Sequence, residues 1–367
     1  MSSGTPDFIP GLELSRLFYE QAVGPLLEQH FSGLKYSAAL IGHGSDVVGF
    51  DTATSMDHDW GPRLLLFLSE DDHAKHADAI SAMLAEKLPR RLAGFSTHFC
   101  ELDELGTQWM IEPEDGPVRH RVKPHTVRGF FSSSLGIDPH EPITPARWLT
   151  MPQQELLAVT AGEVFHDGLG ELEPIRAGLA WYPHDVWLYL MACQWGRIAQ
   201  ERGFVGRAGE VGDELGSAII AARLVRELMR LCFLMEKRYA SYGKWLGTAF
   251  SRLRCGDELR PVFVEALAAR DWKIRERHLA KAYTLIAAMH NKLDVTAPLP
   301  TQPVQFYGRP YVTVDADAFV KALREAIRDP AVRAIKLNIG SVDQFLDSTD
   351  ALTNATLCAK MFWILDV

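Results

Sequence analysis

Residues 42–68 read GHGSDVVGFDTATSMDHDWGPRLLLFL, and this stretch decides both the fold class and the candidate chemistry of the chain. Asp57 and Asp59 precede RLLLFLS (63–69), which the apolar pattern predicts as a buried strand. Carboxylates at positions i and i+2 of an extended segment point to the same face, about 6–7 Å apart along the strand. Two such groups repel each other, so we expect a cation between them.

A predicted strand also precedes this stretch. KYSAALIG (35–42) runs into the small turn at Gly44 and Ser45. Upstream, residues 11–31 repeat apolar side chains at helical spacing, with an interruption expected near Gly24-Pro25. Downstream, 70–88 reads as a helix with acids in its first turn, and FSTHFCEL (95–102) and VRHRVKPHTVRGFF (118–131) read as strands. This order predicts a small mixed-sheet domain over residues 1–142.

From about residue 145 the pattern becomes helical. Long apolar-faced helices are expected at 183–204 and 216–246, and two more within 258–292. A Pro-rich joint at 296–303 introduces a hairpin that turns at Gly308 and a helix at 315–330. The predicted fold class is therefore α+β: a mixed-sheet domain, a mostly α-helical domain over 143–295, and a short α/β tail module over 296–367.

Composition limits the function classes. The 367 residues are 47% hydrophobic and 23% charged, which is typical of a folded globular protein. The net charge of −9 argues against nucleic acid as a partner, because nucleic-acid binders usually carry a basic face. The five cysteines form no CxxC motif, the N-terminus has no signal-peptide pattern, and no apolar run is long enough to cross a bilayer. We expect a cytoplasmic protein with no membrane partner.

The Gly-Ser turn and the paired acids together favour metal-assisted nucleotidyl transfer. A small turn after a strand lets backbone amides and a hydroxyl approach phosphates closely. Paired carboxylates can hold Mg²⁺, which neutralises a triphosphate and orients its α-phosphorus. Asp57 follows Ser45 by twelve positions. The pattern predicts Gly44 and Ser45 as nucleotide-binding residues, and Asp57 and Asp59 as catalytic metal ligands. His58, between the two acids, is expected to pack on the opposite face.

The stretch GSDVVGFDTATSMDHDWGPR resembles the core motif of the polymerase-beta-type nucleotidyltransferase superfamily. The resemblance covers roughly residues 8–140 and is closest to an uncharacterised bacterial branch with a helical C-terminal half. It implies that Gly44 and Ser45 hold phosphates, that Asp57 and Asp59 ligate Mg²⁺ (or Mn²⁺), and that ATP or another NTP is the substrate.

A second likeness lies in the helical half. YASYGKWLG (239–247) is similar to the Gly-Lys-Trp segment of aminoglycoside nucleotidyltransferases, which implies that Lys244 contacts a nucleotide phosphate. Alternatively, Lys244 lies at a helix end where cations are favoured. The carboxylate expected as general base about four residues earlier falls on Ala240. Glu236, two turns before Lys244 on the same helical face, could substitute as the catalytic base or could form a surface ion pair.

The chain departs from the superfamily at the third metal ligand. The acid expected on a neighbouring strand falls on Lys123, and no acid lies between Arg119 and Phe131. A shifted register would instead bring in Glu101, Asp103 or Glu112. Two smaller acidic stretches, GEVFHDGLGEL (162–172) and NIGSVDQFLDSTDAL (338–352), are interpreted as a Gly-rich loop and as helix caps with solvated acids.

Three functions remain from the sequence. The first is an Mg²⁺-dependent nucleotidyltransferase that moves a nucleoside monophosphate to a hydroxyl of a small molecule or a protein. The second, favoured by Lys123, is a nucleotide-binding regulatory protein with little or no turnover. The third is a phosphohydrolase that binds metal with the His58-Asp59 pair and outlying histidines such as His43 and His73. It ranks last because such sites normally lie on helices and the glycines around 42–61 disfavour a helix.

Overall fold

The computed structural model describes residues 6–104, 106–112, 115–361 and 363. The chain divides into two compact units. One comprises Met1–Pro142 with Glu155–Ala180, and the other comprises Ile143–Gln154 with Trp181–Val367. The sequence predicted three domains with boundaries after 142 and 295; in the structure the residues after 295 lie in the same compact unit as the long helices.

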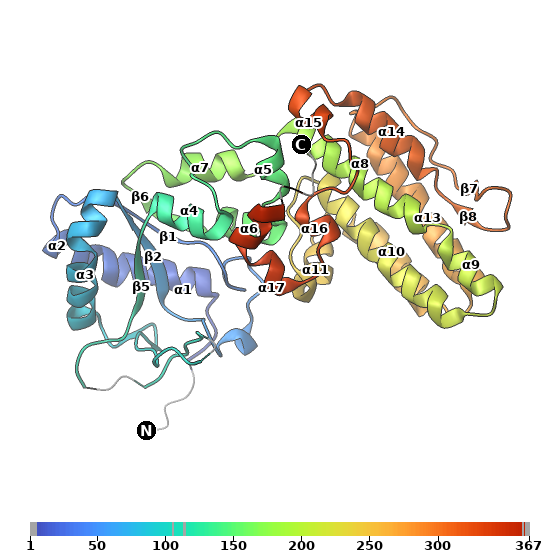
Figure 1. The fold of residues 1–367 in the computed structure, drawn as a ribbon. Helices are drawn as coiled ribbons and strands as arrows, with labels where there is room; N and C mark the ends of the chain where they lie inside the picture. The colour runs from blue at the N-terminus through green and yellow to red at the C-terminus, as the bar shows by residue number, and fades with distance from the viewer. Residues whose placement is uncertain (1–5, 105, 113–114, 362, 364–367) are drawn as a thin grey trace. The chain divides into compact units, whose positions relative to one another are not determined.

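The first unit is built on a four-stranded mixed sheet in the order β5-β2-β1-β6 (Figure 1). β1 pairs antiparallel with β2 and β6, while β2 and β5 run parallel. These are β1 (Tyr36–Leu40), β2 (Arg63–Leu68), β5 (Arg121–Thr126) and β6 (Glu163–Asp167). Two-residue strands β3 (Arg91–Leu92) and β4 (Phe95–Ser96) form a separate ribbon.

The helices of this unit are α1 (Gly11–Phe18), the π-helical segment η1 (Tyr19–Val23), α2 (Gly24–His30), the 3₁₀ turn η2 (Ala53–Ser55), α3 (Glu70–Lys87), α4 (Val127–Leu135) and α7 (Leu172–Leu179). The first two residues of α6 (Gln153–Thr160) belong to the second unit, and the rest of this helix, from Glu155 onward, belongs to the first.

Alternation along β2 divides the core into two faces. Leu64, Leu66 and Leu68 join the cluster formed with α1, η1, α2 and α3. The opposite face carries Phe67, whose ring meets Phe130 of α4 at 5.3 Å between centroids. This period of two explains why an uninterrupted leucine run forms a strand buried on both faces. The mixed α+β class predicted from the sequence is confirmed.

Three predicted elements differ in detail. The helical run over 11–30 is continuous. In place of the expected interruption it contains the π-helical segment Tyr19–Val23, and the Gly24 amide, just before Pro25, donates to the Tyr19 carbonyl. The predicted strand 95–102 is wrong beyond β4, because the chain turns after Ser96 and only an isolated bridge joins Phe99 to Met110. The predicted strand over 118–131 ends at Thr126, whose hydroxyl caps α4 by accepting from Gly129.

The stretch predicted as a Gly-rich loop at 162–172 contains β6. Alternation is absent there, so the sequence pattern did not reveal the strand, and a register shift between Ala38 and Ala39 marks its irregular pairing with β1. Asp167 at its end accepts the Ser37 hydroxyl (2.6 Å) and the amides of Gly170 and Glu173. These hydrogen bonds fix the turn into α7.

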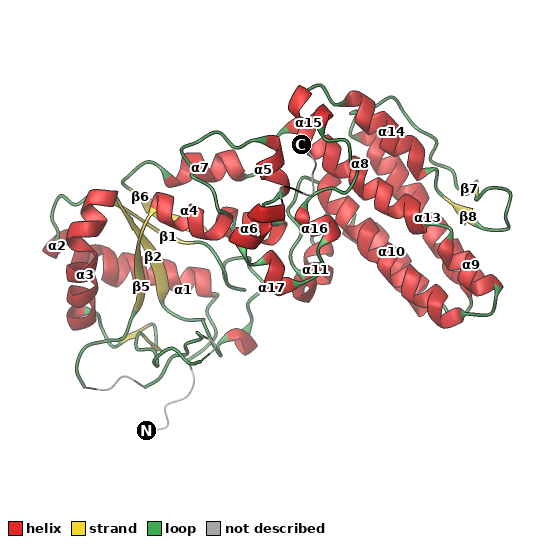
Figure 2. Cartoon of the chain, in the orientation of Figure 1, coloured by secondary structure: helices red, strands yellow, loops and turns green. Residues whose placement is uncertain are grey.

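The second unit is almost entirely helical, apart from the short antiparallel ribbon of β7 (Val304–Gln305) and β8 (Val312–Thr313) (Figure 2). Its ribbon turns through Gly308, as predicted. The helices are α5 (Pro145–Leu149), α8 (His184–Glu201), α9 (Phe204–Glu210), α10 (Glu214–Met235), α11 (Gly243–Phe250), α12 (Gly256–Ala268), α13 (Trp272–Lys292), α14 (Ala316–Ala326), α15 (Pro330–Ala334), α16 (Val342–Phe345), α17 (Thr349–Leu352) and α18 (Ala355–Lys360). Among the described residues, no helix combines the length and the apolar character needed to cross a membrane.

The tail segment packs into this helical unit. Phe319 of α14 stacks on Trp195 of α8 at 4.3 Å between ring centroids and meets His290 of α13 edge-on. Ser341 forms the N-terminal capping box of α16, and Asp347 pairs with Arg226. The predicted helix cap in 338–352 is therefore confirmed, whereas Asp343 is not a solvated acid but accepts the backbone amide of Gln153.

Gly162 fixes the approach of β6 to the end of β1, and this yields a test of the fold. Its φ is +70°, and a Cβ there would lie 2.0 Å from the Leu40 carbonyl oxygen. Gly170 has the same conformation (φ +71°) but open space around it. Gly170→Ala should cost only the left-handed strain of about 1–2 kcal/mol. Gly162→Ala should cost more than about 3 kcal/mol, because strand separation is added to the strain.

Urea denaturation of both variants measures the difference. Equal losses of unfolding free energy would show that the β6 approach is not as tight as described.

Candidate functional site

The turn after β1 leaves no room for a side chain at Gly44. Gly44 has φ +147°, and a Cβ there would lie 2.2 Å from Asp46 Oδ1 and 2.3 Å from Arg63 Nη2. The Phe50 amide donates to the Ser45 carbonyl (2.8 Å), which closes the turn. The Gly-Ser pair therefore forms a compact turn, and the side chains of Asp46 and Arg63 fill the space beside Gly44.

Asp46 and Arg63 hold this turn against β2. Asp46 is 2% exposed, and Arg63 meets it with two nitrogens, Nη2 to Oδ1 at 2.7 Å and Nε to Oδ2 at 3.3 Å. Arg63 also donates to the His43 carbonyl at 3.2 Å. Sequence reasoning missed both residues, because a buried acid next to a Gly-Ser pair looks the same in sequence as a solvated one.

The predicted placement of Asp57 and Asp59 at the opening of an extended strand is wrong. Both lie in the loop before β2, which begins only at Arg63. Asp59 has φ +53°, a left-handed conformation that Asp tolerates, and its amide donates to the Gln108 carbonyl. The physical reason is the burial of Trp60, which is 2% exposed and donates to Asp51, so the chain must turn inward there.

Each of the two carboxylates has a close side-chain partner of its own. Asp57 lies 3.1 Å from His58 Nδ1 in an exposed pair, so His58 does not pack in the core as expected. Asp59 lies 2.6 Å from Arg121 Nη1, and the Arg121 side chain is only 10% exposed. The two acids therefore contact different side chains, His58 and Arg121.

β5 carries a row of basic side chains on one face. Arg121, Lys123 and His125 alternate along the strand, and the parallel register sets Arg121 opposite Arg63 of β2. The pKa of Arg121 is lowered mainly by burial and next by the Arg63 charge. The pKa of Lys123 is lowered mainly by partial desolvation and next by the Arg121 charge. Burial, followed by the Lys123 charge, lowers the pKa of His125. Arg63, Arg121 and Lys123 repel one another, so a polyanion beside the first half of β5 would relieve them.

Glu101, Asp103 and Glu112, the acids considered as alternatives for the third metal ligand, contact other residues in the structure. Glu101 lies 3.8 Å from Arg119 and is exposed, and Glu112 pairs with Arg91. Asp103 accepts the amide and hydroxyl of Thr107. β5 itself, residues 121–126, contains no acid. Within the described residues, no group of three or more His, Cys, Asp or Glu side chains is arranged to hold a metal ion.

The two predicted residues of the helical unit have defined surroundings. Glu236 is almost buried at the end of α10 and accepts the amides of Arg254 and Cys255, both at 2.9 Å. Burial acts to raise its pKa, but these hydrogen bonds hold the pKa below its ordinary value. These contacts fix the start of α12. Its role as a catalytic base stays a prediction.

Lys244 lies in the first turn of α11, and its Nζ is 5.1 Å from the Trp245 ring centroid. A cation at a helix N-terminus is disfavoured by the helix dipole, so the helix end does not explain this lysine. The predicted phosphate contact of Lys244 stays a prediction.

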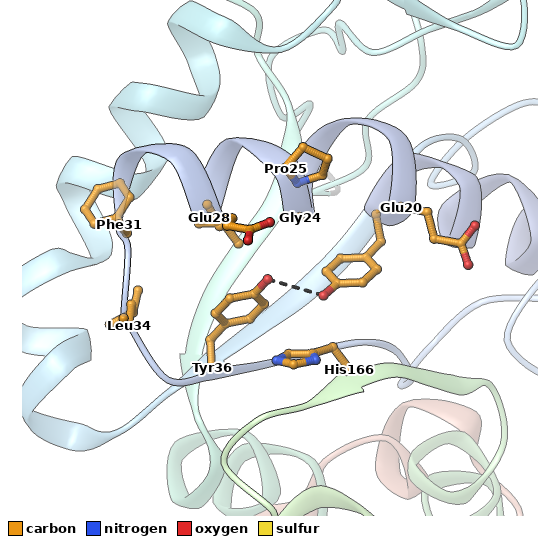
Figure 3. Close-up of a pocket in the computed structure, with 11 residues that line it drawn as sticks. Glu20, Gly24, Pro25, Glu28, Phe31, Leu34, Tyr36 and His166 are labelled. Atoms are coloured by element: carbon orange, nitrogen blue, oxygen red, sulfur yellow. Dashed lines mark hydrogen bonds between the residues drawn. The ribbon is translucent and has the colours of Figure 1, made fainter.

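A cavity of about 440 Å³ lies near the other end of β1 and differs in character (Figure 3). Tyr36 at the start of β1, His166 of β6, and Glu20 and Glu28 of the first helical run line it. Its lining includes no Lys or Arg among the described residues. With two carboxylates and no basic side chain in its lining, this cavity does not suit a triphosphate.

Residues 148–246 match a protein family described as "Domain of unknown function (DUF4037)". No curated protein matches the chain. A solved structure of a nucleotidyltransferase-like protein from Exiguobacterium sibiricum 255-15 is similar at 11% identity and a TM-score of 0.32, over 78% of this chain and 82% of that chain. The family match excludes Gly44 to Asp59, so the functional assignment of that stretch rests on its own residues.

The Asp59–Arg121 pair predicts unequal effects of two matched substitutions. Asp59→Asn keeps the side-chain size and the tolerance for positive φ but leaves the enclosed Arg121 without its carboxylate. We expect a loss of roughly 1–3 kcal/mol in unfolding free energy. Asp57→Asn removes one member of an exposed pair and should change it by less than about 0.5 kcal/mol.

Chemical denaturation without ligand measures both variants. A larger loss for Asp57→Asn would contradict the described pairing.

Proposed function

We propose that the chain is a Mg²⁺- or Mn²⁺-dependent nucleotidyltransferase. It would move a nucleoside monophosphate from ATP or another NTP to a hydroxyl of a small molecule or protein. One observation carries the proposal: the Gly44-Ser45 turn, Asp46 and Asp59, and the cations Arg63 and Arg121 come together at one end of the mixed sheet. Carboxylates and cations side by side are what a metal-bound polyphosphate requires.

The residues of the first unit have distinct roles in this proposal. The backbone of Gly44 and Ser45 holds phosphate oxygens, and Arg121 and Lys123 neutralise the charge of the polyphosphate. In the reaction, the acceptor oxygen attacks the α-phosphorus, the bond to the β-phosphate oxygen breaks, and pyrophosphate leaves. Lys244 as a further phosphate contact and Glu236 as the base that takes the acceptor proton belong to the same proposal.

The donor chemistry fits a magnesium ion. Mg²⁺ is commonly bound by one or two carboxylates together with substrate phosphates and waters, and Asp57 and Asp59 supply such carboxylates. When bound, the ion would neutralise phosphate charge and orient the α-phosphorus. Because Asp59 is paired with Arg121 without ligand, Arg121 must exchange this carboxylate for a phosphate when the nucleotide binds.

A second function, nucleotide binding without turnover, is favoured by β5. The strand carries Lys123 where a third carboxylate was expected, and a cation there opposes a second metal ion. Pyrophosphate release from ATP across a panel of hydroxyl acceptors separates the two functions. Release supports the transferase, whereas ATP binding without release by both the wild type and Lys123→Glu supports the regulatory protein.

The metal assignment predicts a conditional thermal shift. ATP should raise the melting temperature only with Mg²⁺ or Mn²⁺, by a stabilisation of about 2.7 kcal/mol at a concentration 100-fold above Kd. The double variant Asp57→Asn with Asp59→Asn should lose this shift. Asp78→Asn on the exposed face of α3 is the control and should retain it.

Differential scanning fluorimetry with and without EDTA reports the shift. A full ATP shift in the double variant would refute the metal assignment.

A further inference from the structure

His43 and Glu155 form a pair beside the Gly44-Ser45 turn that the sequence did not reveal. His43 Nε2 lies 3.2 Å from Glu155 Oε2. The His43 side chain is 65% exposed, whereas that of Glu155 is 2% exposed. The pair therefore presents an accessible imidazole on a buried carboxylate, which is the arrangement that orients a histidine for proton transfer.

Glu155 is a buried acidic side chain with one polar atom that lacks a partner in the described part of the chain. It lies in the first turn of α6, and its second oxygen, Oε1, is buried and has no hydrogen-bond partner among the described residues. A buried carboxylate is costly unless a cation compensates it. The imidazole of His43 contacts this side chain, and the hydrogen bond to Glu155 raises the pKa of His43.

The charges around His43 act in opposite directions. The hydrogen bond to Glu155 of α6 raises the pKa of His43 above its ordinary value, while partial desolvation and the Arg63 charge from β2 act to lower it. The net effect extends the charged imidazolium to higher pH. With Nε2 bound to Glu155, Nδ1 is the nitrogen that can donate to a ligand.

We propose that His43, held by Glu155, binds the departing pyrophosphate and supplies its proton. This inference rests on the proposed nucleotidyl transfer. As the bond between the α-phosphorus and the bridging oxygen breaks, that electron pair stays on the bridging oxygen of pyrophosphate, and the Nδ1–H proton of His43 passes to it. Neutral His43 then takes up a proton from water. His43 touches the leaving group, and Glu155 is a positioning residue.

The position of the turn supports this role. Arg63 donates to the His43 carbonyl at 3.2 Å and also fixes Asp46, so the backbone that carries the imidazole is the backbone that forms the proposed phosphate-binding turn. His43 directly precedes Gly44, so its side chain branches from the backbone one residue before the proposed phosphate-binding amides. In contrast, His58 belongs to the exposed pair with Asp57 and His140 to a pair with Glu171.

Calorimetry with inorganic pyrophosphate and Mg²⁺ tests the inference without an acceptor. At pH 6 the wild type should bind pyrophosphate roughly tenfold more tightly than His43→Gln, as expected for a charge-assisted hydrogen bond. Above the pKa of His43 this ratio should fall toward one. In Glu155→Gln the tighter pyrophosphate binding should be lost at a lower pH than in the wild type. The control is His140→Gln, which changes an exposed pair, and it should bind pyrophosphate as the wild type does at every pH.

Proton uptake gives a second readout. Titrations at pH 8 in two buffers of different ionisation enthalpy should show more protons taken up by the wild type than by His43→Gln. If the two proteins bind pyrophosphate with equal affinity and take up equal numbers of protons, while the Mg²⁺-dependent ATP shift is intact, the role of His43 is overturned. The proposed function would then stand. Failure of the wild type to bind either pyrophosphate or ATP would contradict the proposed function and this inference together.

Discussion

The ion pair between Asp46 and Arg63 holds the turn after β1 against the start of β2. Both partners are almost enclosed, so loss of either would leave an uncompensated charge. The pair also crowds the space around Gly44, where a Cβ would meet both side chains. The other groups of the candidate site depend on this arrangement, because the parallel pairing of β2 and β5 brings Arg121 beside Arg63.

The resulting site is rich in cations that are already paired or mutually repelling. Arg121 is paired with Asp59, and its pKa is lowered by burial and by Arg63. Phosphate binding in such a site would be an exchange of partners, in which a carboxylate leaves Arg121 and becomes available to a metal ion. In the proposed function this exchange would link metal and nucleotide binding in one equilibrium, because each ligand would favour the same rearranged state.

The sequence was informative where the pattern is local. The leucine run of β2, the Gly-Ser turn after β1 and the hairpin at Gly308 follow from alternation and turn chemistry, and their elements were predicted correctly. The conformation at Asp59 was missed because the burial of Trp60 overrides the extended pattern around it. The partners of Asp59 and His43 come from Arg121 and Glu155, which are distant in sequence, and a single sequence contains no signal for such pairs.

The central claim is that the carboxylates before β2 hold a metal-bound nucleotide at the Gly44-Ser45 turn. Anomalous diffraction from crystals grown with Mn²⁺ and a non-hydrolysable ATP analogue tests it most directly. The account predicts a manganese peak within coordination distance, roughly 2.0–2.3 Å, of oxygens from Asp57 and Asp59, with Arg121 turned to a phosphate. A nucleotide bound elsewhere, with the Asp59–Arg121 pair intact, would contradict the account.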